Sequence, residues 1–71
     1  MGEMELLSEV AVLQDIPEKG LVRGQVGTVV ETLSPGVLEI EFSDDAGRTY
    51  AQLAVREGQL MVLHYQPQQA A

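Results

Sequence analysis

The clearest pattern in the chain is a strict alternation of apolar and acidic positions near its middle. Leu38, Ile40 and Phe42 fall on one side of an extended backbone, and Glu39 and Glu41 fall on the other. Successive side chains of a strand point to opposite faces, so this segment predicts a half-solvated antiparallel strand. Its apolar face should contact a core and its acidic face should contact water.

Four further segments are short, apolar or β-branched, and bounded by turn-forming residues. No helical period extends beyond about two turns. The pattern therefore predicts five strands, at residues 9–13, 26–33, 37–42, 49–55 and 60–65. The residues expected in the core are Val10, Val12, Val29, Leu38, Ile40, Phe42, Leu53 and Val62, joined by Val55.

The connections between these segments carry distinct turn signals. A long loop over residues 14–24 contains Pro17 and Gly20, whereas residues 34–36 and 43–48 predict hairpin turns. Residues 56–59 predict a short turn of 3₁₀ type before the last strand. Several short strands joined mostly by tight turns favour a small barrel, because closure removes exposed sheet edges.

Gly24 and Gly27 precede the β-branched run Thr28-Val29-Val30. At one or both glycines we expect a positive φ or a neighbouring backbone within reach of a Cβ. Small SH3-like barrels enter their second strand in this way. We therefore predict an all-β, five-stranded antiparallel SH3-like barrel over residues 6–65, with residues 1–5 and 66–71 as flexible termini.

The chain has 71 residues and no cysteine. This is the size of one small domain, in which a deep catalytic pocket is not expected. The lack of cysteine excludes disulfides and thiolate sites and agrees with a reducing cytosol. No apolar run reaches the roughly 18 residues of a membrane span, and the start of the chain is acidic where a secretory signal is basic. We expect a cytoplasmic protein that does not bind membranes.

Eleven acidic side chains against four basic ones give a net charge of −7. Phosphate contacts dominate most nucleic-acid affinity, so nucleic acid is not an expected partner. The charge instead favours a basic protein partner or cations. The alternative is that it serves only to keep a small domain soluble.

Several motifs together carry a family resemblance, which covers about residues 6–65. They are Asp15-Ile16-Pro17-Glu18-Lys19-Gly20-Leu21, Gly24-x-x-Gly27-Thr28-Val29-Val30-Glu31, Glu39-Ile40-Glu41-Phe42-x-Asp44, Gly47-x-Thr49 and Leu60-x-Val62-Leu63. As a set they resemble the bacterial domain-of-unknown-function family 4926. The resemblance implies a stand-alone small protein, sometimes encoded beside a second small protein in what looks like a toxin and antitoxin pair. It implies no catalytic or binding residues.

The long loop is the first candidate for recognition, because loops on rigid sheets commonly carry binding residues. Its proline and glycines have an alternative explanation, which is that they turn the chain across the barrel. The second candidate is the acidic face of the middle strand, which could form a stripe with Glu31 and Asp44. The candidate partner-binding residues are Glu18, Lys19, Leu21, Arg23, Glu39 and Glu41.

Asp44 and Asp45 form the densest carboxylate group. Their position before Gly47 favours turn chemistry over a weak cation site, since calcium loops spread their ligands over alternate positions. His64 is the single histidine and has no second ligand nearby in sequence, so we assign it a surface or packing role rather than metal or acid–base work.

We expect no catalytic, cofactor or metal site, and hence a non-enzymatic protein-binding module. One form of that role is neutralisation of a genetically linked partner, as an antitoxin does. The alternative is a weak cation-binding or buffering protein that uses the acidic hairpin.

Overall fold

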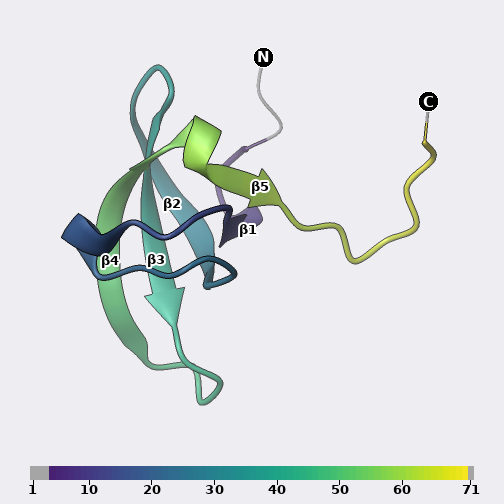
Figure 1. Ribbon diagram of the computed structural model, residues 1–71. Helices are drawn as coiled ribbons and strands as arrows, with labels where there is room; N and C mark the ends of the chain where they lie inside the picture. The colour runs from purple at the N-terminus through teal and green to yellow at the C-terminus, as the bar shows by residue number, and fades with distance from the viewer. Residues whose placement is uncertain (1–3, 71) are drawn as a thin grey trace.

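The computed structural model describes residues 4–70 and contains one antiparallel sheet of five strands (Figure 1). The strands are β1 (Glu9–Val12), β2 (Val26–Ser34), β3 (Val37–Ser43), β4 (Thr49–Arg56) and β5 (Leu60–Val62). Two 3₁₀ turns, η1 (Pro17–Lys19) and η2 (Glu57–Gln59), lie between strands. The sheet order is β4-β3-β2-β1-β5. The chain is thus all-β, and its curled sheet has the form of a small SH3-like barrel, as predicted.

The last strand is shorter than predicted, ending at Val62 instead of Tyr65. The reason is the length of its neighbour. Within residues 4–70, β5 pairs only with β1, which begins at Glu9, and the carbonyl of Glu9 accepts the final hydrogen bond, from the N–H of Leu63. Beyond Leu63 none of the described strands is available for pairing, so His64 and Tyr65 lie exposed outside the sheet.

The core is formed by the inward-facing residues of all five strands. Two residues predicted to be buried, Leu53 and Val62, are instead half-buried and pack against its margin. Both lie on strands at the ends of the sheet order, Leu53 on β4 and Val62 on β5. Within residues 4–70 no ladder joins β4 to β5, but Val55 and Leu60 on the same two strands are buried, so edge position alone does not account for the partial exposure of Leu53 and Val62. The buried residues are Val10, Val12, Ile16, Leu21, Val29, Leu38, Ile40, Phe42, Val55 and Leu60.

The long loop between β1 and β2 completes this core. Ile16 and Leu21 exchange two backbone hydrogen bonds across η1 and are both buried. Figure 1 shows the loop, in dark blue, running across the sheet toward β4. At the end of the loop, Gln25 donates a side-chain hydrogen bond to the hydroxyl of Tyr50 on β4, at 3.0 Å. The loop therefore packs as part of the barrel.

The ends of the packed region differ from the predicted 6–65. Met4 packs against the core, and the N–H of Leu7 donates to the carbonyl of Val29 on β2. The packed chain thus includes Met4, which was assigned to a flexible terminus. Residues 66–70 are exposed and have no regular secondary structure. Of the termini expected to be flexible, residues 1–3 and 71 lie outside the described residues.

Candidate protein-binding surface

The face of the sheet that points away from the core carries a row of polar side chains across four strands. Glu9 on β1 lies opposite Thr28 on β2, Thr28 lies opposite Glu41 on β3, and Glu41 lies opposite Gln52 on β4. Strand alternation explains this row. Each of its residues points outward because the adjacent residues on its strand point inward. We call this surface of β1–β4 the outer face.

A second acidic pair lies on the outer face beside this row. Glu39 on β3 pairs with Glu31 on β2, next to a register shift in β2 that begins at Val29. Like charges directly opposite each other in a sheet destabilise the pair. The outer face thus carries four carboxylates, those of Glu9, Glu31, Glu39 and Glu41. The opposed pair of Glu31 and Glu39 lowers the stability of the fold, so folding by itself does not favour this arrangement.

Neutral donors hold three of these carboxylates in place. Glu9 accepts hydrogen bonds from the hydroxyls of Thr28 at 3.2 Å and Tyr65 at 2.9 Å. Glu41 accepts one from the Thr49 hydroxyl at 2.6 Å, and Glu39 accepts one from the Gln52 amide at 2.9 Å. The donors bring no positive charge, so these hydrogen bonds orient each carboxylate without forming an ion pair.

The bond between Tyr65 and Glu9 also changes the acidity of the phenol. The pKa of Tyr65 lies above its usual value, first because its hydroxyl donates to the Glu9 carboxylate. Desolvation and the negative charge of Glu9 act in the same direction. The raised pKa favours the protonated phenol, which is the form that donates to Glu9.

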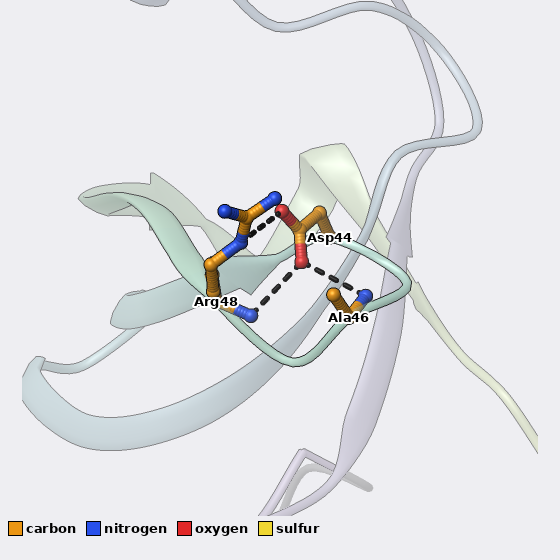
Figure 2. Close-up of polar contacts among 3 residues, drawn as sticks. All are labelled: Asp44, Ala46 and Arg48. Atoms are coloured by element: carbon orange, nitrogen blue, oxygen red, sulfur yellow. Dashed lines mark hydrogen bonds and ion pairs between the residues drawn. The ribbon is translucent and has the colours of Figure 1, made fainter.

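The one ion pair within residues 4–70 lies in the β3–β4 hairpin and does not involve these four glutamates. Figure 2 shows Asp44 at its centre. Its Oδ1 accepts hydrogen bonds from the N–H groups of Ala46 and Arg48, both at 2.9 Å, and its Oδ2 lies 3.3 Å from Nε of Arg48. Gly47 has a φ of +83°. The turn chemistry predicted for this hairpin is confirmed.

The residues expected to bind a partner do not form one site. Glu39 and Glu41 lie on the outer face, whereas Glu18 and Lys19 are exposed on η1. The two η1 residues line a groove of about 530 Å³ whose other wall includes Arg56 at the end of β4. Arg23 is exposed, and its N–H donates to the carboxylate of Asp15 at 2.9 Å.

Leu21 was expected at the partner surface, and this expectation is corrected. Its side chain is only 2% exposed because the bridge to Ile16 turns it into the core. Its role is therefore packing of the loop.

Glu9 is an outer-face glutamate that the sequence did not single out, whereas Glu31 was expected to extend the stripe of Glu39 and Glu41. The place of Glu9 next to the buried Val10 showed that it faces outward, but its neighbours depend on the pairing of β1 with β2. A hollow of about 200 Å³ connects Glu9 with the candidate residue Glu41. The hollow is lined by Glu9, Val26, Gly27, Thr28, Glu41, Ser43 and Asp44.

Metal-ligand clusters and membrane-spanning helices are both absent from residues 4–70. No group of three or more His, Asp or Glu side chains in residues 4–70 is arranged to hold a metal ion. His64 is exposed beyond the last strand. None of the helical turns in this part of the chain is long and apolar enough to cross a bilayer.

Comparison with known proteins gives one match. The family model described as "Domain of unknown function (DUF4926)" matches residues 6–62, which is most of the chain. No curated protein and no solved structure matches significantly.

Proposed function

The chain belongs to the DUF4926 family, and we propose that it is a non-enzymatic module that binds a basic protein partner through its outer face. The observation that carries the proposal is the arrangement of Glu9, Glu31, Glu39 and Glu41. They share one face of a rigid sheet, and the one ion pair of residues 4–70 includes none of them.

Two physical arguments support binding over solubility alone. A surface of one sign attracts an opposite charge over a distance of about a Debye length and speeds encounter. Moreover, Glu9, Glu39 and Glu41 are already held by neutral hydrogen-bond donors. Side chains that are ordered before binding lose less conformational entropy when a partner arrives. Charge that served only solubility would gain nothing from such positioning.

The same charge disfavours nucleic acid and anionic membrane surfaces as partners. We place the protein in the cytoplasm, where its partner is a basic protein, and antitoxin-like neutralisation of the product of a linked gene is one form of this role. As an antitoxin-like protein, it would use the outer face to cover the basic surface through which the partner acts.

The first test is capture of the partner. The protein is immobilised and exposed to the soluble fraction of its native cells, with the product of the neighbouring gene added, at about 50 mM salt, where attraction is screened less than at physiological salt. We expect a basic protein at a stoichiometric amount, released as the salt is raised. If no stoichiometric partner is recovered at low salt, the binding proposal is wrong.

The second test locates the surface. We expect Glu39→Gln/Glu41→Gln to slow association with the captured partner by about tenfold and to change dissociation less. Glutamine preserves the shape and an amide oxygen as hydrogen-bond acceptor. Glu5→Gln/Glu57→Gln, outside the strands, removes the same charge and should slow association less than about twofold. Equal effects of the two double variants would show that net charge, and not the outer face, controls encounter.

The alternative is a cation-buffering role for the acidic hairpin. Since Asp44 already bonds to Ala46 and Arg48, the hairpin favours the turn over an ion. A ligand that binds only the folded state stabilises it by mass action. At constant ionic strength, we therefore expect millimolar calcium to leave the melting temperature unchanged, whereas a clear increase would support the alternative.

A further inference from the structure

An apolar row crosses the outer face next to the carboxylates. Ala11 on β1 lies opposite Met61 on β5 and opposite Val26 on β2. Met61 is 48% exposed and Val26 is 41% exposed. The row therefore presents apolar side chains from three adjacent strands to solvent. We call it the apolar row.

The apolar row and the acidic residues belong to one surface. Ala11 is two residues from Glu9 on β1, and Val26 is two residues from Thr28, the neighbour of both Glu9 and Glu41. Side chains two positions apart on a strand share a face and lie roughly 7 Å from each other. Val26 also lines the hollow that contains Glu9 and Glu41.

We propose that the apolar row docks an amphipathic segment of the basic partner. This inference rests on the proposed function and specifies the chemistry of the partner. Apolar side chains of the segment cover Met61, Ala11 and Val26, while neighbouring lysine or arginine side chains reach Glu9 and Glu41. Long basic side chains suit this geometry, because their stems pack on apolar surface while their charged ends reach the carboxylates.

Charge decides between such a partner and a second copy of this chain. Two copies that meet through this surface would bring Glu9 and Glu41 of each close to those of the other, and each copy has a net charge of −7. Like charges brought together at an interface oppose association. A basic segment brings the opposite charge to the same positions, so the complementary occupant is a different protein.

The test uses two synthetic peptides of equal length and equal positive charge. One forms a helix with leucine along one face and lysine flanking that face, and the other replaces every leucine by serine. We expect the lysine–leucine peptide to bind at least tenfold more tightly, since covering the exposed parts of Met61 and Val26 adds apolar burial to charge attraction. In the double variant Val26→Thr/Met61→Gln, most of the difference in affinity between the two peptides should disappear. The affinity for the lysine–serine peptide should stay unchanged.

Leu33→Gln is the matched control, because Leu33 is 45% exposed but lies near the β2–β3 hairpin. It should leave both affinities unchanged. A measurement on the wild-type protein removes any dependence on how the variants fold. The methyl resonance of Met61 should shift with the lysine–leucine peptide and not with the lysine–serine peptide.

The possible outcomes separate the two proposals. If the two peptides bind with equal affinity, the apolar row has no docking role, and the glutamates of the outer face remain the binding surface. The same holds if Leu33→Gln weakens binding of the lysine–leucine peptide as much as Val26→Thr/Met61→Gln does. Absence of binding by either peptide at low salt overturns both. A preference for the lysine–leucine peptide that vanishes only in the Val26 and Met61 variant supports the inference.

Discussion

Gly27 and Gly24 lie three residues apart before the body of β2, and they are needed for different reasons. A Cβ on Gly27 would lie 2.5 Å from a methyl carbon of Ile40 and 2.9 Å from the backbone oxygen of Glu41. Gly24 has open space around it but a φ of +94°, which L residues rarely adopt. The expectation of a positive φ or a close backbone contact at these positions is confirmed. Gly24 has the positive φ, and Gly27 has the close backbone contact.

We expect Gly27→Ala to lower the free energy of unfolding by roughly 1–3 kcal/mol, because the backbone atom it meets cannot move aside as a side chain does. Chemical denaturation measures the change. Gly58→Ala is the control, since a Cβ there meets nothing within 4 Å and φ is not positive. That variant should stay within about 0.5 kcal/mol of wild type. Equal stability of the two variants would show that Gly27 can be replaced.

At the scale of elements, the boundary of the core is formed by three parts of the chain. They are the loop between β1 and β2 and the two edge strands, β4 and β5. The loop inserts Ile16 and Leu21, closing a bridge around η1. Leu53 and Val62 on the edge strands are half-buried, whereas Val55 and Leu60 on the same strands are buried. The loop therefore adds buried apolar side chains to those that the edge strands supply, which matters in a domain of this size.

Leu21→Ala should lower the free energy of unfolding by about 2–5 kcal/mol, the range for truncating a buried leucine. Val22→Ala is the matched control in the same loop, because Val22 is 57% exposed, and it should cost less than about 0.5 kcal/mol. The comparison requires only thermal or urea unfolding curves. If Leu21→Ala is as mild as its neighbour, the loop does not stabilise the barrel.

For the whole molecule, the distribution of charge is the dominant feature. The net charge is −7, and the outer face carries four glutamates, including the opposed pair Glu31 and Glu39. Self-repulsion of this kind destabilises the compact state, and the same charge attracts a basic partner. Folding and binding should therefore respond to salt in opposite directions.

Raising sodium chloride from about 10 mM to about 200 mM shortens the screening length several-fold. We expect the melting temperature of the free protein to increase over this range while affinity for the partner decreases. Glu39→Gln should raise the melting temperature at low salt and reduce its dependence on salt, because it removes one charge of the opposed pair. A melting temperature that falls with salt would show that attraction dominates the folded state.

Much of the strand pattern followed from the sequence alone. Alternation of Leu38, Ile40 and Phe42 with Glu39 and Glu41 determined which side chains face inward, because the period of a strand is a local property. Turn chemistry at Asp44 was equally local, since its partners lie within four residues.

Tertiary structure decided the features that depend on pairing between distant segments. Leu21 is buried because the loop folds back onto the core, and Leu53 is only half-buried although alternation places it on the inward face. Neither property has a periodic signal in the sequence. The register of β1, β2 and β3 brings Glu9 beside Glu41, and the pairing of β1 with β5 adds Met61 to the same face. Alternation determines the side to which a residue points, whereas strand order and register determine its neighbours there.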